Sequence, residues 1–535
     1  MSNGTLSRET QELLDAYKKA IELEKKYNET EGDKIAVHQV SGKIAFFYEK
    51  LRNTIDYKEE HLLRKNAIER ILKRRIMTEK TESDVAKFLV YELIRARYLP
   101  NKKIPESRIK EIEEIVGKYT FLLNKIPESE DGRSREGIFD WIIGVASCEI
   151  EEKIVPHGRE NAMVAFTRAI VEKKMTLKED IRITPQEKKD LIYAAVLKNL
   201  IKSDISMIRY RLFIAKHSEW VFAPSEETIA RLALIINSIT SEIDGVINHT
   251  YSDNFSRAVK KNIAYFTTLQ DVIDGHIDDI DYVFSHHFHI EDSLKETCVK
   301  KYRKAKTKLN RAALRSITYI FITKVILALI IELPFDKYII GEVNYFALGV
   351  NILFPPLLMA LVVLTIKVPS KKNTDLIVAG VKDMIYGKYE GSPFVVKGVA
   401  SRTSLFARVF KFLYLIVFVI SFGGIIFILN KFGFNFISIG LFLFFISVVS
   451  YFGIRIRQNA RELLVTQKKE GMVGFAADLF SIPIIQVGQW LSVKMSNINV
   501  FVYVMDFIVE APFKTFVDIF EDWIYYIKEE RDKIE

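Results

Sequence analysis

The sequence predicts an all-α membrane protein in which a cytoplasmic helical bundle or array is joined to a four-helix transmembrane region and C-terminal amphipathic helices. Three observations predict this fold class. Four apolar runs lie in the second half of the chain, a basic segment directly precedes the first of them, and the first 299 residues show helical periodicity. Alternating β-branched runs bounded by turn signals are absent there, so a sheet has little support.

The amino-terminal part is expected to form helical cytoplasmic subdomains at 1–127 and 134–299. The stretch PESEDGRS between them is rich in turn-forming residues and is the best linker candidate. The sequence Thr184-Pro185-Gln186-Glu187 has the form of a capping box with proline at the first helical position, and it predicts a helix start. Further on, six apolar residues at spacings of 3 and 4 predict either a coiled coil or, because the pattern is short, an ordinary bundle helix. They are Ile229, Leu232, Ile236, Ile239, Ile243 and Val246.

Residues 300–315 form a basic juxtamembrane segment with eight basic side chains and no acidic one. The net charge is −3 before this segment and +4 after it, so the basic character of the chain is concentrated at one junction. Cytoplasmic flanks of membrane helices are enriched in Lys and Arg, which places the preceding residues in the cytoplasm. Anionic lipid is therefore the expected partner, whereas nucleic acid is not. The predicted lipid contacts are Lys300, Lys301, Arg303, Lys304, Lys306, Lys308, Arg311 and Arg315.

The transmembrane region is expected at 316–454, because each apolar run approaches the roughly 20 residues that cross a hydrocarbon core. The predicted spans are about 317–333, 345–366, 412–429 and 436–452.

The charges beside these spans predict one topology. Glu332, Asp336, Lys337 and Glu342 make the first connection net negative, whereas the second connection and the residues after the fourth span are basic. The positive side of a membrane protein faces the cytoplasm. Both termini are therefore expected in the cytoplasm, and the expected location is a bacterial inner (cytoplasmic) membrane.

Three residues stand out inside the spans. Lys324 is the one strongly ionisable residue within a predicted span, but at about 1.5 Å per residue it lies only some 11 Å from Ile317. Its ammonium group is therefore expected to reach the membrane surface by snorkelling, with a functional role as the alternative. Pro355 and Pro356 are expected to kink their helix and free backbone carbonyls, which is typical of packing and also of pores.

Residues 455–535 are expected to form a cytoplasmic amphipathic or interfacial region. Its clearest element has an apolar face at spacings of 3 and 4, formed by Phe513, Phe516, Phe520, Trp523 and Ile527. The opposite face carries acidic residues, which disfavours attraction to anionic lipid and favours packing on protein. Whether residues 483–527 insert in the membrane is left open by the sequence.

A histidine cluster precedes the basic segment. His276, His286, His287 and His289 lie among seven acidic residues between Asp271 and Asp292, and imidazole with carboxylate suits zinc, iron or manganese. The spacing does not match an HExxH helix or another recognised ligand pattern. A solvated acidic hinge is the favoured interpretation, and the four histidines are a candidate metal site. No other cofactor is predicted.

The leading functional hypothesis is a multi-pass membrane scaffold or adaptor whose helical head binds an unidentified protein partner. The first alternative is an oligomeric transporter or channel component gated by the head, which would be a homo-oligomer with Lys324, Pro355 and Pro356 near its pathway. The second is a membrane-associated metalloenzyme using the histidine cluster. No catalytic residue is predicted, because no nucleophile elbow or phosphate-binding loop occurs.

Overall fold

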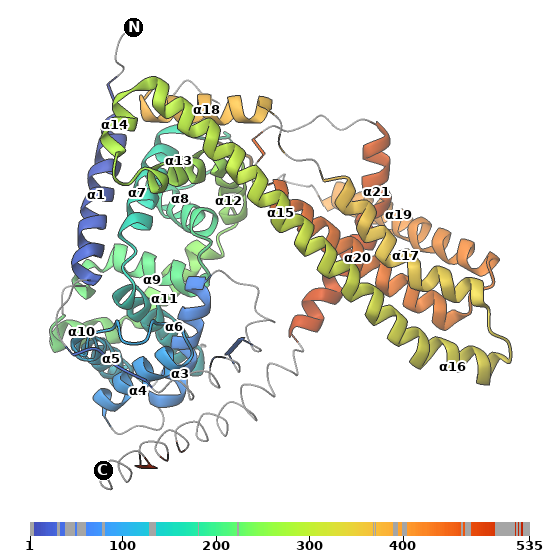
Figure 1. The fold of residues 1–535 in the computed structure, drawn as a ribbon, viewed down its shortest axis with the longest axis horizontal. Coiled ribbons are helices and arrows are strands. Elements are labelled where there is room, and N and C mark those ends of the chain that lie inside the picture. The colour runs from blue at the N-terminus through green and yellow to red at the C-terminus, as the bar shows by residue number, and fades with distance from the viewer. Residues whose placement is uncertain are drawn as a thin grey trace. The chain divides into compact units, whose positions relative to one another are not determined.

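The computed structural model of the chain is drawn in Figure 1. It describes residues 5–497 apart from 29–32, 38–45, 47–48, 51–59, 77–80, 128–134, 180, 222–223, 367–368, 370, 389–393, 399–403, 462–463 and 466–471, and beyond 497 it describes residues 519, 523, 526 and 527. Nearly all the regular structure in these residues is helical, which confirms the predicted all-α class.

The described residues fall into two compact units. The head unit comprises Thr5–Lys260 and Met384–Gly398, and the span unit comprises Lys261–Asp383 and Val399–Asn499. Residues 261–299 thus group with the apolar helices and not with the head. The predicted boundaries at 127, 134 and 299 are not tested by this division and stay predictions.

The head unit is built around α6, whose buried residues lie on nearly every side of the helix. A helix that is apolar all round must be enclosed by others, and α6 packs against α3, α5 and α9. The helices of this unit are α1 (Arg8–Asn28), α3 (Glu60–Ile76), α4 (Glu82–Arg95), α5 (Ser107–Lys125), α6 (Arg135–Ile154), α7 (Gly158–Lys174), α8 (Pro185–Leu200), α9 (Ile205–Lys216), η1 (Ser218–Trp220), α10 (Glu226–Leu234), α11 (Ile236–Ile247) and α12 (Ser252–Lys260).

The predicted helix start at Thr184 is confirmed. The Thr184 hydroxyl accepts a hydrogen bond from the Glu187 backbone N–H, and the Glu187 carboxylate accepts one from the Thr184 N–H, so the capping box is complete. The predicted seam from Ile229 to Val246 does not form one helix. It is divided between α10 and α11, which meet at Ile235, so the coiled coil is not confirmed.

One small sheet occurs in the head unit, which the sequence did not predict. Strands β1 (Met175–Leu177) and β2 (Phe394–Val396) pair in parallel, with Met175 opposite Phe394. Three residues per strand carry too little periodicity for a sequence signal. The pairing joins a segment that follows α7 to a segment that lies between two predicted spans.

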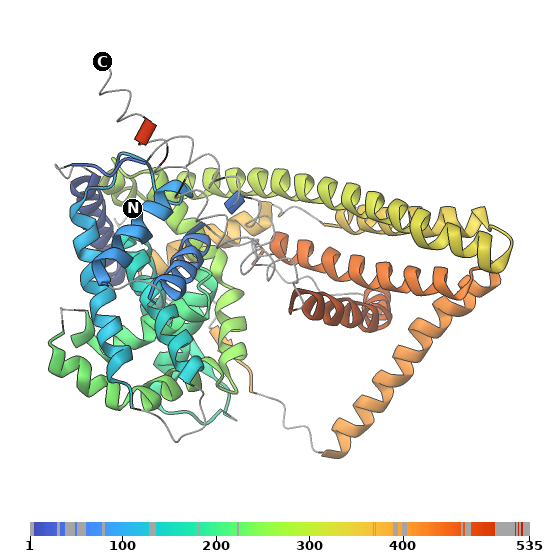
Figure 2. The same ribbon diagram turned by 90° about the horizontal axis from the view of Figure 1, so that it is seen from below.

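The span unit contains a helix of 41 residues, α15, which Figure 2 shows as one unbroken rod. The basic segment is part of it, so no loop separates those charges from the first apolar run. The helices of this unit are α13 (Ile263–Gly275), α14 (Ile280–Ser285), α15 (His287–Leu327), η2 (Ala328–Glu332), α16 (Leu333–Phe335), η3 (Asp336–Ile340), α17 (Tyr345–Leu364), α18 (Lys371–Ile385), α19 (Ser404–Lys431), α20 (Phe436–Arg461) and α21 (Met472–Asn497).

Four helices of the described residues are long and apolar enough to cross a membrane, which agrees with the four predicted spans and is compatible with a membrane protein. The first helical run differs from its prediction because it continues through η2, α16 and η3 to Ile340. It ends where Gly341 adopts φ 91°, a left-handed conformation that glycine tolerates. Glu332 and Asp336 therefore lie inside this run and are buried, whereas the sequence-based prediction placed Glu332 at the end of the first span and counted both charges toward the connection after it.

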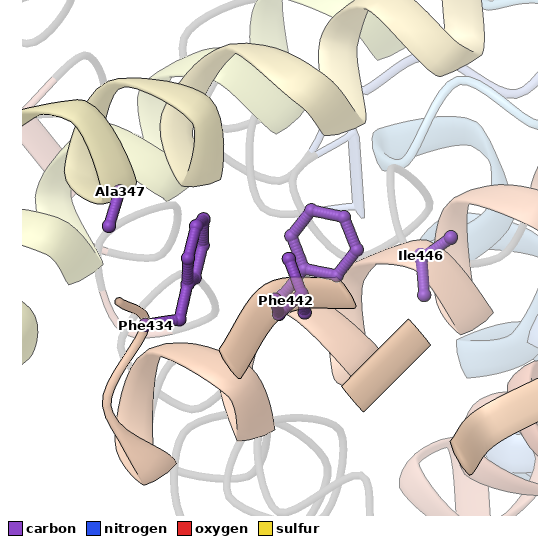
Figure 3. Packing of buried hydrophobic residues seen from close by; sticks show 5 residues of the cluster. Ala347, Phe434, Phe442 and Ile446 are labelled. Atoms are coloured by element: carbon purple, nitrogen blue, oxygen red, sulfur yellow. The ribbon is translucent and has the colours of Figure 1, made fainter. Parts of the chain in front are cut away.

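The apolar helices pack through large side chains at one end of the bundle. Figure 3 shows Phe434 and Phe442 pointing from α20 and the turn before it toward the helix that carries Ala347. Phe442 also lies 5.0 Å from Phe354 between ring centroids. Leu429 of α19 joins the cluster, so three of the four candidate spans meet there. We call this end, formed by residues 340–344 and 431–435, the hairpin end.

Helix α21 packs against the middle of α19 and α20. The Ser421 hydroxyl donates to the Phe480 carbonyl at 3.1 Å, and the Tyr414 hydroxyl donates to Gln486. Gly488 lies so close to the Ser447 carbonyl that a Cβ atom there would overlap it. Residues 480–488 therefore contact candidate spans, although the sequence placed them in a cytoplasmic or interfacial region.

Replacement of Gly488 by alanine is expected to destabilise the span unit by about 1–3 kcal/mol, because the new methyl group meets the backbone of α20. Gly440→Ala is the matched control, since a Cβ atom at Gly440 of α20 meets nothing within 4 Å. Thermal unfolding of the two purified variants in one detergent measures the difference. Equal melting temperatures would show that α21 does not pack on α20 as described.

Candidate functional site

An ion pair is enclosed among the candidate spans. The Lys324 ammonium lies 2.8 Å from Glu332 Oε1, and both side chains have 0% exposure. In a regular α-helix these positions, eight apart, are offset by about 80° around the axis. The π-helical turn η2 inserts one extra residue before Glu332, which reduces the offset to about 20°. The π turn thus brings the two side chains to the same face.

The other oxygen of Glu332 is bound by two neighbouring helices. Asn351 of α17 donates to Oε2 at 2.6 Å, and the Ser438 hydroxyl of α20 donates to it at 3.3 Å. The Asn351 amide also donates to the Ser438 carbonyl at 3.2 Å. Three helical segments therefore converge on one carboxylate, all through donors. A buried carboxylate needs such donors because it cannot keep its hydration.

The polar contacts continue toward the hairpin end. Asn435 accepts a hydrogen bond from the Ser438 backbone N–H at 2.8 Å and donates to the Asp336 carboxylate, which is 4% exposed. Asn344 caps α17 and donates to the carbonyls of residues 432 and 433. We call the hydrogen-bonded set Lys324, Glu332, Asn351, Ser438, Asn435 and Asp336 the polar column.

On the other side of Lys324 the interior is apolar. The ammonium lies 4.8 Å from the centre of the Phe445 ring, which suits a cation because the ring face is electron-rich. Phe445 belongs to a buried cluster with Ile320, Met359 and Val449. The polar column therefore extends from Lys324 toward the hairpin end only.

The predicted intramembrane residues are partly brought together. Lys324 does not snorkel, because the Glu332 carboxylate binds its ammonium group in the interior. Pro355 and Pro356 are buried inside α17, and Pro355 lies one turn after Asn351, whose backbone carbonyl loses its usual N–H partner there. Glu332, Asn351 and Ser438 were not predicted. The available signal was an amide in the middle of an otherwise apolar run.

The predicted lipid contacts lie on α15. Seven of the eight side chains are exposed, whereas Lys301 is half-buried and pairs with Asp271 at 2.8 Å. Spacings of 4, 4, 3 and 4 place five of them on one face of the helix. This basic stripe comprises Lys300, Lys304, Lys308, Arg311 and Arg315. Contact with lipid stays a prediction.

The histidine cluster is divided between two places. His276 lies 3.3 Å from Asp279, whereas His286 and His289 flank the ring of Tyr282 with centroid distances of 4.8 Å and 4.9 Å. Among the side chains that the structure describes, no group of three or more potential ligands is placed to hold a metal ion. The side chain of His287 lies outside them, so the metal site stays a prediction.

The predicted interfacial helix is described in part. Trp523 and Ile527 are helical and exposed. Phe513, Phe516 and Phe520 lie outside the described residues, so the apolar face stays a prediction.

The head unit encloses a second ionic network, which the sequence did not single out. His157 lies 2.8 Å from Glu151 and 3.0 Å from Glu160, and Arg64 binds the other oxygen of Glu151. Burial alone would lower the pKa of His157, but its hydrogen bonds to Glu151 and Glu160 outweigh burial and raise that pKa to about 10. Burial likewise opposes the lowered pKa of Glu151, which its bond to His157 produces.

Comparison of this chain with protein-family models, with curated proteins and with solved structures finds no match. A functional proposal for this chain therefore rests on the arrangement of its own residues. The polar column is the most unusual arrangement among the described residues, because it encloses ionisable groups within helices that are otherwise apolar.

Replacing one member of the buried pair is expected to cost about 3–5 kcal/mol, because the other charge is left uncompensated. Lys324→Met and Glu332→Leu should each show this loss. The double variant should recover most of it, because both charges are gone and Asn351 keeps the Ser438 carbonyl as an acceptor. Unfolding free energies of the three variants in one detergent measure the coupling. Additive losses would mean that the two residues do not interact.

The His157 network predicts a loss of head stability at alkaline pH. The folded pKa is raised from 6.5 to about 10, so the stabilisation is complete below about pH 6.5 and is lost as the pH rises toward 10. The expected loss is on the order of 5 kcal/mol. Thermal unfolding of the full chain at neutral and alkaline pH tests this, with His157→Asn as the comparison. The pH dependence of the variant should be flatter than that of the wild type.

Proposed function

We propose that the protein is a membrane scaffold whose cytoplasmic helices hold a protein partner at a fixed height above the bilayer. The observation that carries the proposal is the unbroken course of α15, which continues from residues beside α13 and α14 into the first candidate span. A continuous helix fixes the position of its cytoplasmic end relative to its membrane end, whereas a flexible linker does not.

Contacts around the first half of α15 support this proposal. We call α13, α14, α18 and that half of α15 the platform. Lys301 binds Asp271 and the Thr267 carbonyl of α13, and Glu291 binds Lys382 of α18 at 2.7 Å. Gly380 approaches the ring of Tyr265 so closely that a Cβ atom would lie 2.5 Å from it. The platform is therefore closely packed onto the helix that leads into the candidate spans.

The basic stripe supports attachment to the cytoplasmic leaflet. Its five charges point to one side of α15 just before the first apolar run, where anionic headgroups would lie. Each charge near an anionic leaflet contributes about 1 kcal/mol, and Arg311 and Arg315, which lie nearest to the first apolar run, are expected to contribute most. The same charges favour a topology with the head in the cytoplasm.

Transport is a second candidate function, favoured by the polar column. Ionisable residues inside a membrane often mark ion or proton pathways. The scaffold remains the first choice because the column packs fully and ends against the apolar cluster around Phe445.

The scaffold is tested by purifying the full chain in lipid nanodiscs and determining bound proteins, lipids and metals by mass spectrometry. A stoichiometric protein partner, lost when the platform is loosened by Gly380→Phe, is the expected result. Solute flux in proteoliposomes that disappears on Lys324→Leu would favour transport instead. Stoichiometric metal lost on replacing His286, His287 and His289 would favour a metalloenzyme.

The lipid contact has a test with a matched control. Arg311→Gln with Arg315→Gln removes the two stripe charges nearest the first span, and Arg303→Gln with Lys306→Gln removes two charges outside the stripe. Residues 303 and 306 lie about 21 Å and 16 Å along the helix from Ile317, each more than a Debye length of about 10 Å at 0.1 M salt. The first pair should reduce retained anionic lipid more strongly. Equal retention by both variants would contradict a lipid-binding stripe.

A further inference from the structure

Part of the head unit comes from the connection between the second and third candidate spans. This part is Met384–Gly398, which begins in the last turn of α18 and ends before α19. The chain reaches it from the rest of the head only after the first two candidate spans, Phe288–Ile340 and Tyr345–Leu364. We call the described residues 384–388 and 394–398 the strap.

The first part of the strap is bound by residues at the start of α1. The Ser7 backbone N–H donates to the Ile385 carbonyl at 2.8 Å, and the Thr10 hydroxyl donates to the same oxygen at 3.1 Å. The Ser7 hydroxyl donates to the Met384 carbonyl at 3.3 Å. A helix leaves its last four carbonyls without α-helical partners. The head therefore supplies the hydrogen bonds that end α18.

The second part of the strap is strand β2, which pairs with β1. Phe394 and Val396 on β2 are 2% and 0% exposed, whereas the side chain of Val395 between them points to the exposed face. The side-chain amide of Asn254 in α12 donates to the Lys397 carbonyl at 2.6 Å. Strand β2 packs on α12 as well as on β1. Its apolar face thus belongs to the core of the head.

The residues before the spans therefore form an incomplete head. Among the described residues, β2 is the only partner strand of β1, and an isolated short strand is not stable. Removal of Phe394 and Val396 exposes the apolar side chains that they cover. The buried Thr10 hydroxyl also loses its bond to the Ile385 carbonyl.

The strap restricts the topology of the first two candidate spans. Segments that share a sheet or exchange backbone hydrogen bonds lie in one compartment, so α1, β1 and the strap are on the same side of a membrane. A single crossing would place the strap on the opposite side, so the two spans can cross only as a pair. This restriction is independent of the flanking charges, which predict the same topology.

We infer that the head completes its fold only after the first two candidate spans have inserted as a hairpin. During synthesis α1, β1 and α12 are made before those spans, and the strap is made after them. Insertion of both spans returns the strap to the side on which the head waits for it. The strap thus makes the stability of the head depend on correct insertion. This inference does not depend on the scaffold function.

The strap is tested by hydrogen exchange in the full chain in lipid nanodiscs. Phe394→Ala removes a buried ring from β2, and Val395→Ala, which shortens an exposed side chain of the same strand, is the matched control. Protected backbone amides of α7 and α12 should exchange about 100-fold faster or more in Phe394→Ala and at the wild-type rate in Val395→Ala. Equal exchange in the two variants would contradict a strap that completes the head.

The dependence on insertion is tested with lysine pairs at exposed positions near the middle of two spans. Leu353→Lys with Leu357→Lys alters the second span, and Val419→Lys with Ile420→Lys alters the third span, which follows the strap. Charges there oppose insertion. Limited proteolysis in native membranes should show that the first pair removes the protease resistance of the head and that the second pair leaves it.

The side on which the strap lies is determined in the same membranes. Lys397→Cys is added to each variant, and its labelling by an impermeant reagent in sealed vesicles is measured by mass spectrometry of that peptide. Head resistance should be lost in molecules whose strap lies on the opposite side. Resistance retained in those molecules, or equal loss with both lysine pairs, would overturn the inference.

Discussion

The span unit depends on one constraint, which is that the Lys324 and Glu332 charges have no access to bulk water and must satisfy each other. Their pairing at 2.8 Å determines what surrounds them. The π-helical turn η2 turns Glu332 toward Lys324, and α17 and α20 each supply a donor to the remaining carboxylate oxygen. Contacts between apolar side chains are non-directional, whereas a carboxylate accepts hydrogen bonds only from donors in particular positions. The polar column therefore fixes the register of three helical segments that leucine and phenylalanine contacts would leave adjustable.

Helix α15 extends the effect of this fixed register beyond the buried ion pair. Because the same helix carries the platform contacts, the basic stripe and the first candidate span, a rotation or shift at one level is passed along its whole length. Lys301 and Lys324 are 23 residues apart on it, about 35 Å of helix. The buried pair thus anchors a rod on which the platform is mounted, and the stripe faces one side of that rod. A scaffold requires this combination of stiffness and fixed orientation.

Several features could be read from the sequence because they are local. The capping box at Thr184 needs only four residues, and four apolar runs of suitable length indicate four helices that can cross a membrane. Lys324 was identified as unusual for the same reason. Its partner was missed because Glu332 precedes Pro334 and lies close to Asp336, a pattern typical of a helix end. The π turns absorb an extra residue and let the helix continue, and no single-residue preference reveals such a turn. The seam from Ile229 to Val246 shows the converse error, since spacing alone did not reveal the break at Ile235.

The sequence by itself determined the helical class, the number of apolar runs and the position of the basic segment. These follow from composition and periodicity, which indicate for each short segment which residues face water and which face an apolar environment. Only the tertiary structure decided which polar side chains meet. Asn351 and Ser438 lie 19 and 106 residues from Glu332, and no local pattern links residues so far apart. The same limit applies to α21, because no local pattern shows that Gly488 lies against the Ser447 carbonyl of α20. Long-range contacts form when helices pack, and the hydrogen-bond partners of a buried charge are defined only by that packing.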